Sequence, residues 1–149
     1  MIPLTLARDL KRAGLDWHPK TGDCFAIPDR DLDDRVFYIT DMAIRIALLH
    51  GQPTVMFQGA YEWALDYILL TEVVWIPEEG QLRGRIESLL PVSASPSLRL
   101  TQTPGGYVCE IADGGEYSTH AGEDAASAYG HALLHLLSPP EDSTHERTP

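Results

Sequence analysis

The sequence predicts an α+β fold, in which helices flank a mostly antiparallel sheet and a ββ(β)α unit follows at the C-terminal end. Apolar residues recur at helical spacing in several segments, and short β-branched or aromatic runs between them are bounded by Gly and Pro. Hydrophobic residues make up 44% of the 149 residues, which is close to the globular norm and is enough to bury a core.

The first segment predicts a helix that Pro3 or Thr5 opens. Its apolar residues recur at spacings of three and four, and Gly14 stands where a helix commonly ends. Two short strands are expected next, over residues 24–27 and 36–40, because the residues there favour extended backbone.

The segment 42–50 fits two kinds of element. Its apolar residues alternate as in a strand, but several of them also suit a helix. We interpret it as a strand because residues 50–53 (His-Gly-Gln-Pro) have the composition of a hairpin loop. Residues 54–57 would then form the returning strand.

The following elements are predicted to be a helix over 60–70, a buried strand over 73–76 and a further helix that begins near Glu78. Acidic residues in the first turn of that last helix suit its dipole. Its buried stripe is expected to contain Leu82, Ile86, Leu89 and Leu90.

Residues 91–97 form the predicted linker, because they contain two prolines, three serines and no charge. They separate a predicted α+β domain, 1–90, from the ββ(β)α unit, 98–137. A unit of ~40 residues is too small for a comfortable core, so we expect it to pack on the first domain or on a second copy of the chain. The polar tail, 138–149, is expected to be flexible.

Turn residues define the strands of the C-terminal unit. Pro104-Gly105-Gly106 predicts a hairpin between strands over 98–103 and 107–112, and a second Gly-rich turn leads to a short third strand. Apolar residues at helical spacing then predict a helix over 123–137, with its polar side toward solvent.

Charge limits the classes of partner. The chain has 22 acidic and 11 basic residues and a net charge of −11, which argues against binding to nucleic acid or to an anionic membrane surface. It has neither a signal-peptide pattern nor a membrane-spanning apolar stretch, so we expect a cytoplasmic protein. The cysteines, Cys24 and Cys109, are expected to be buried thiols.

Several motifs resemble a known family. The motifs are Leu15…Trp17…Pro19…Gly22-Asp23, Glu62-Trp63-Ala64-Leu65-Asp66 and Val73-Val74-Trp75-Ile76-Pro77. They resemble, over residues 4–90, a family of small bacterial and phage-borne proteins of unknown function that often carry the label "pilus assembly protein CpaE". The C-terminal part resembles a small sandwich unit of phage proteins. The resemblance implies a phage or mobile-element origin and no particular activity.

The ATPase activity in that label can be tested on the residues. Such an ATPase needs a Gly-rich loop with a lysine to hold the phosphates. The chain has no G-x-x-x-x-G-K-[S/T] pattern and no lysine after Lys20. We therefore exclude a P-loop ATPase and expect no cofactor.

Histidines offer one candidate metal site. His131 and His135 lie four residues apart on the predicted last helix, so they can share one face, and His120 is a candidate third ligand. A small metal-dependent enzyme would follow from this reading. The same spacing also places both helix residues on an ordinary solvated face, which is the simpler interpretation.

Acidic residues offer the candidate binding surfaces. The segment with Asp29, Asp31, Asp33 and Asp34 has the start of a calcium loop but lacks its required Gly and Glu. Glu62 and Asp66 share one face of a predicted helix, where they could act as an acid/base pair or pair with arginines.

The leading hypothesis is a non-enzymatic, acidic module that binds a protein with a basic surface, as an adaptor or inhibitor. Acidic side chains would then steer the encounter. Self-association into a homo-oligomer through a sheet edge is an alternative. The three tryptophans, Trp17, Trp63 and Trp75, are expected to pack in the core, whereas an exposed one would indicate a binding hot spot.

Overall fold

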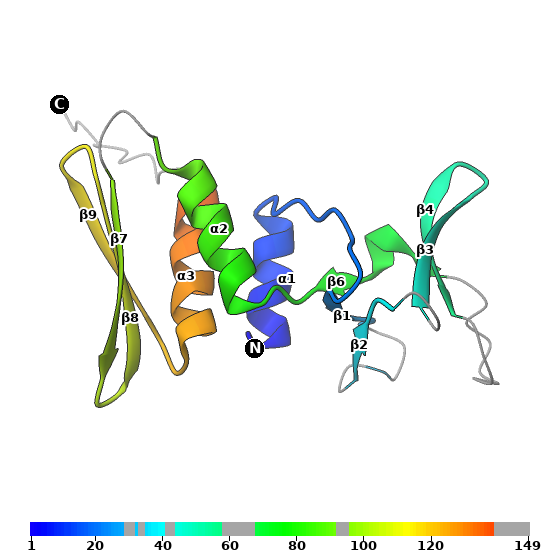
Figure 1. Ribbon diagram of the computed structural model, residues 1–149, viewed down its shortest axis with the longest axis horizontal. Helices are drawn as coiled ribbons and strands as arrows, with labels where there is room; N and C mark the ends of the chain where they lie inside the picture. The colour runs from blue at the N-terminus through cyan, green and yellow to red at the C-terminus, as the bar shows by residue number, and fades with distance from the viewer. Residues whose placement is uncertain (29–31, 33–34, 41–43, 58–67, 92–95, 139–149) are drawn as a thin grey trace, which may run out of the picture.

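The computed structural model gives the chain three α-helices and nine strands in the part that it describes. Along the long axis of the molecule, the C-terminal sheet lies at one end, the α-helices lie in the middle and the two other sheets lie toward the opposite end (Figure 1). The description covers all residues except 29–31, 33–34, 41–43, 58–67, 92–95 and 139–149.

The helices are α1 (Leu4–Arg12), α2 (Glu79–Leu89) and α3 (Ala125–Leu137), with a short 3-10 helix, η1 (Leu70–Glu72). The strands are β1 (Cys24–Ala26), β2 (Val36–Tyr38), β3 (Ile44–Leu49), β4 (Gln52–Phe57), β5 (Ile68–Leu69), β6 (Val74–Trp75), β7 (Ser97–Thr103), β8 (Gly106–Asp113) and β9 (Glu116–Gly122).

The strands form three small antiparallel sheets, with the orders β2-β1-β6, β3-β4-β5 and β7-β8-β9. The α+β class and the C-terminal three-stranded unit with its helix are therefore confirmed. The strand interpretation is also confirmed over 44–49, because Ile44 pairs with Phe57 and Leu49 with Gln52 across the hairpin. His50 and Gly51 make its turn, both with positive φ.

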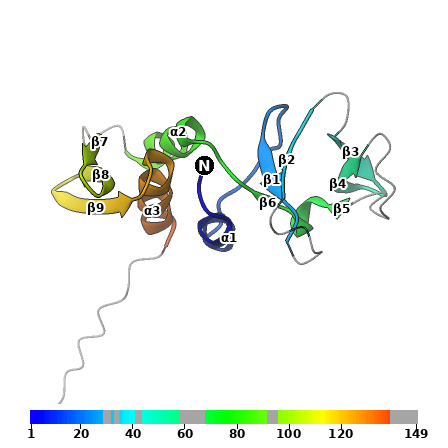
Figure 2. The same ribbon diagram turned by 90° about the horizontal axis from the view of Figure 1, so that it is seen from below.

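The sheet β2-β1-β6 lies between two hydrophobic clusters. Side chains alternate along a strand, so Cys24 and Ala26 join the cluster beneath the helices, whereas Phe25 and Ile27 join the cluster shared with β3 and β4. All three residues of β1 are buried for this reason. Figure 2 shows this sheet between the helices and the sheet β3-β4-β5.

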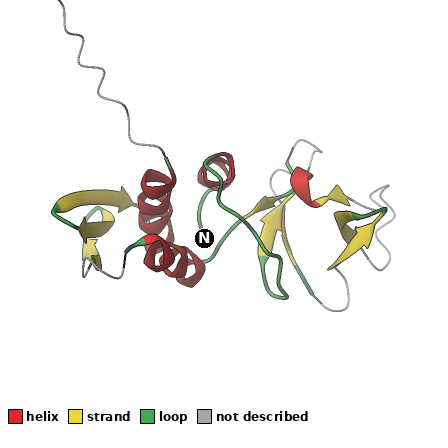
Figure 3. Ribbon diagram, turned by 90° about the horizontal axis from the view of Figure 1, so that it is seen from above, coloured by secondary structure: helices red, strands yellow, loops and turns green. Residues whose placement is uncertain are grey.

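Helix α3 is surrounded on several sides. Its residues 126–130 are buried in succession, because the helix packs against β8 and β9, α2 and α1. A Cβ added at Gly130 would lie 2.8 Å from Cδ2 of Leu6, so α1 approaches α3 closely at this glycine. Figure 3 shows the three α-helices grouped beside the C-terminal sheet. Residues on both sides of 91–97 thus share one core cluster.

Two sequence predictions about the segment from residue 60 to the end of α2 were wrong, and the first concerns the helix expected before β6. The expected helix over 60–70 is not an α-helix at its C-terminal end, because Ile68 and Leu69 form β5 and pair with Val55 and Thr54, and Leu70 begins the 3-10 helix η1. Its remaining residues 60–67 lie outside the described part.

Leu89 was assigned to the buried stripe of the following helix. Its side chain is instead 48% exposed, while Leu82 and Ile86 are fully buried. The stripe continues past the end of α2 at Leu90, which is buried beyond the last helical turn.

Some predictions concern residues outside the described part. The tail 139–149 and most of the linker, 92–95, belong to this group. Within the described residues no helix has the length and apolar character needed to cross a membrane.

Candidate functional site

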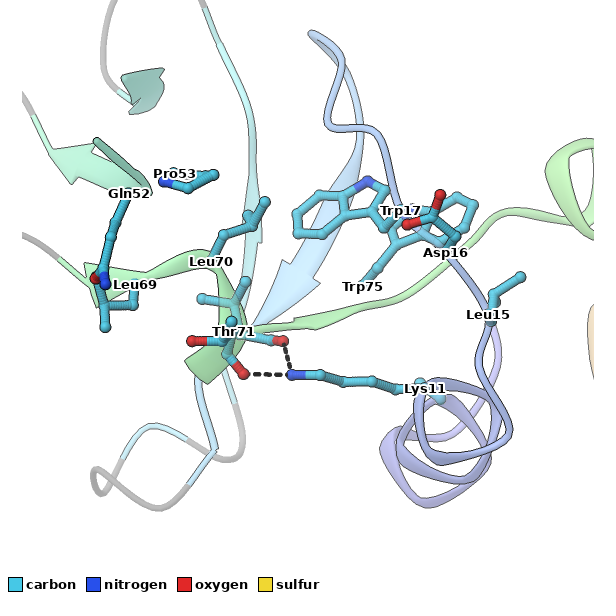
Figure 4. A pocket seen from close by; sticks show the side chains of 12 residues that line it. Lys11, Leu15, Asp16, Trp17, Gln52, Pro53, Leu69, Leu70, Thr71 and Trp75 are labelled. Carbon is cyan, nitrogen blue, oxygen red and sulfur yellow. Dashed lines mark hydrogen bonds between the residues drawn. The ribbon is translucent and has the colours of Figure 1, made fainter. Parts of the chain in front are cut away.

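A cavity of about 450 Å³ lies between α1, the segment 15–17, the β4–β5 edge with η1, and β6. Figure 4 shows the side chains that surround it. Most of its lining is apolar or aromatic, which is the usual character of a binding site. The lining residues are Ala7, Lys11, Leu15, Asp16, Trp17, Gln52, Pro53, Leu69, Leu70, Thr71, Val73 and Trp75.

Two stacked indoles form one wall of the cavity. The ring centroids of Trp17 and Trp75 are 6.1 Å apart and their planes differ by 5°. Both side chains are half-buried and pack against the hydrophobic clusters, which agrees with the expectation for these two tryptophans, while Trp63 lies outside the described residues. The buried Nε1 of Trp75 has no hydrogen-bond partner in the described part, and an unsatisfied buried donor of this kind commonly marks a functional site or a bound water.

Asp23 holds Trp17 in place. Its carboxylate is buried and accepts hydrogen bonds from Trp17 Nε1 and from the backbone N–H of Lys20, both at 2.9 Å, and from Gln81 Nε2 at 2.7 Å. The amide oxygen of Gln81 accepts from the N–H of Glu78 at 2.9 Å. The indole is therefore fixed to the start of α2 before any ligand arrives.

Lys11 closes one side of the cavity. Its ammonium group donates to the carbonyl oxygens of Thr71 and Val73 at 2.6 and 2.7 Å, as the dashed lines in Figure 4 show. Burial lowers the pKa of this lysine. These bonds join α1 to η1 and to Val73, the residue between η1 and β6, so the two sides of the cavity are tied together at this point.

The rim of the cavity carries a negative charge. Asp16 is exposed there, and its carboxylate lies 3.3 Å from Nδ1 of His18. Among the lining residues, Lys11 and Asp16 are the charged ones, and Lys11 is already engaged with two backbone carbonyls. The cavity thus combines an aromatic wall, aliphatic sides and an acidic residue at its entrance. The aromatic and aliphatic lining suits binding of an apolar group.

The candidate histidines lie at the opposite end of the chain's long axis, between β9 and α3. The rings of His120 and His135 have centroids 4.9 Å apart, and His131 Nδ1 is 2.7 Å from the carbonyl oxygen of Ala121. Burial, followed by the charges of His135 and His131, lowers the pKa of His120. In the described part, however, no three His, Cys, Asp or Glu side chains are grouped so that they could hold a metal ion.

The acidic candidates lie outside the described residues. These are Asp29, Asp31, Asp33, Asp34, Glu62 and Asp66. Their suggested roles in calcium binding, acid/base chemistry or partner binding therefore stay predictions. The cysteines were predicted correctly, since Cys24 and Cys109 are free and buried.

Sequence reasoning missed the cavity and the buried Asp23. The cavity joins residues from 7 to 75 in the chain, so no local pattern contains it. A pattern that does precede Asp23 is the turn Thr21-Gly22, in which Gly22 adopts φ +94°, a conformation that favours glycine. Comparisons of the chain with protein-family models, curated proteins and solved structures find no significant match.

Proposed function

We propose that this chain is a non-enzymatic protein-binding module, and that its partner presents a basic surface with an apolar side chain that enters the Trp17–Trp75 cavity. The observation that supports the proposal is the stacked indole pair that faces the cavity. Tryptophans that are held rigidly beside a cavity are typical anchors of protein interfaces.

The lining favours an apolar anchor. The cavity is also lined by Leu69, Leu70 and Val73. A side chain placed there would therefore exchange its contact with water for contact with apolar groups. Burying a Leu, Phe or Met side chain is worth roughly 1.5–3 kcal/mol. Because Asp23 already orients Trp17, little conformational entropy is lost on binding.

The charge of the chain favours a basic partner. The net charge is −11 and Asp16 stands at the entrance, so Lys or Arg residues next to the anchor would meet an attractive field. Electrostatic attraction of this kind acts mainly on the association rate and weakens as salt increases.

Selection from a random peptide library on the immobilised full chain tests this function. We expect enriched peptides to contain one large apolar residue with Lys or Arg close to it. Their affinity should fall by roughly tenfold or more for Trp17→Leu, which removes the flat aromatic wall. Tyr117→Leu is the matched control, because Tyr117 is an aromatic residue that is 63% exposed and far from the cavity.

Two outcomes would contradict the proposal. One is a selection that enriches no sequence. The other is a set of peptides that bind the Trp17→Leu and Tyr117→Leu variants equally well, since the cavity would then make no contribution. Circular dichroism of both variants establishes that each remains folded.

A further inference from the structure

Two histidines from different elements meet at the junction of β9 and α3. His120 lies on β9 and is half-buried against the helix, and His135 lies on the exposed side of α3. Their ring centroids are 4.9 Å apart and their planes differ by 42°. Nothing in the proposed protein-binding function uses this pair.

We propose that His120 and His135 together bind a divalent first-row transition-metal ion, and that Cu²⁺ binds most tightly. Imidazole nitrogen is a ligand that suits Cu²⁺, Ni²⁺ and Zn²⁺, and affinity for a given site rises toward Cu²⁺ in this series. The separation of the rings is compatible with this role, and an ion bound at Nε2 of His120 would displace the hydroxyl of Ser118, whose Oγ lies 3.1 Å from that nitrogen. Two imidazoles that hold one ion side by side, each at ~2.0–2.1 Å, have centroids roughly 5 Å apart.

His131 lies one helical turn before His135, contacts the backbone and is not one of the two proposed ligands. Its Nδ1 lies 2.7 Å from the carbonyl oxygen of Ala121, and because a carbonyl can only accept, this nitrogen carries the proton. The lone pair of its neutral ring is therefore on Nε2.

The number of ligands sets the kind of site. Since no group of three ligating side chains is assembled among the residues that the structure describes, His120 and His135 would leave coordination positions to water. Such a site differs from a closed structural zinc centre, which takes four protein ligands.

Calorimetric titration of the untagged full chain with CuCl₂, NiCl₂ and ZnCl₂ in turn tests the proposal. We expect one ion per chain, with Cu²⁺ bound more tightly than Ni²⁺ and Zn²⁺. His135→Ala and His120→Gln should each weaken Cu²⁺ binding by roughly tenfold or more. His18→Ala is the matched control, because His18 is an exposed histidine outside the pair, and it should leave the affinity unchanged.

The proposal fails if His18→Ala weakens Cu²⁺ binding as much as His135→Ala does. It also fails if His120→Gln and His135→Ala both retain the affinity of the original chain, since the ion would then bind elsewhere. His135 is exposed, so its substitution by Ala is compatible with folding and keeps the test valid even where His120→Gln disturbs the junction.

Discussion

The two ends of the molecule differ in how closely their apolar side chains pack. The C-terminal end packs α3 against a three-stranded sheet and two other helices, and its close contacts are made by Gly130, Ala128 and Ala132. The other end joins two small sheets through a cluster around Phe25 and Val55, and it leaves a cavity beside its tryptophans. Packing is thus dense at one end, whereas incomplete packing leaves a cavity at the other.

The cavity keeps its shape through polar contacts between elements. Its walls are held by polar bonds that bridge elements, through Asp23 on one side and Lys11 on the other, rather than by apolar side chains that fill the space.

Truncation in the dense end should have the largest effect. Leu133→Ala removes a fully buried side chain from the contact of α3 with the sheet, and we expect unfolding free energy to fall by about 2–5 kcal/mol. Leu89→Ala is the matched control, because Leu89 is 48% exposed, and it should cost far less. Urea denaturation measures both, and equal losses would contradict the tight packing of Leu133 in the dense end.

Removal of the buried carboxylate should have the next largest effect. Asp23→Ala leaves the N–H of Trp17 and the amide of Gln81 without their acceptor, so we expect a loss of roughly 2 kcal/mol or more. Tryptophan emission should also shift, because Trp17 loses its fixed position. Asp16→Ala, an exposed carboxylate on the same segment, should change stability little.

Acid should weaken the junction of β9 and α3. Burial and two neighbouring histidines place the pKa of His120 in the folded chain below its ordinary value of 6.5. The unfolded chain therefore binds more protons as pH falls below about 6.5, and stability declines until pH passes below the folded pKa. We expect His120→Gln to reduce this decline, measured by urea denaturation from pH 7.5 to 5 with a chelator present.

The thiols of the folded chain should react only slowly, because both cysteines are buried. Burial raises the pKa of both cysteines, and that of Cys109 to about 11, so little thiolate forms near neutral pH. Labelling by a disulfide reagent at pH 8 should be slow in the folded chain and fast in urea. Rapid labelling of the folded chain would show that the dense core opens readily.

Local patterns were sufficient for most elements. The spacing of Leu6 and Leu10, the hairpin composition of residues 50–53 and the Gly-rich turns of the C-terminal sheet each determine a nearby backbone shape. The prediction of a helix over 60–70 was wrong at its C-terminal end because Ile68 pairs with Val55. This long-range contact overrides the helical spacing of the apolar residues.

The candidate sites depended on contacts between distant residues. The spacing of His131 and His135 indicated one shared face, but the approach of His120 depends on how β9 packs on α3. The cavity required Lys11, Trp17, Leu70 and Trp75 to meet, and their own neighbours in sequence give no indication of this. Apolar residues at such positions look like core residues until their partners are known.

The most direct test of the protein-binding account follows the indole N–H resonances of Trp17 and Trp75 by NMR, assigned by Trp→Phe substitution, during titration with a selected basic peptide. The account predicts that both resonances shift to saturation. A peptide whose apolar anchor is replaced by Ala should move neither. If the original peptide binds and both indole resonances stay in place, its anchor does not enter the cavity and the account is contradicted.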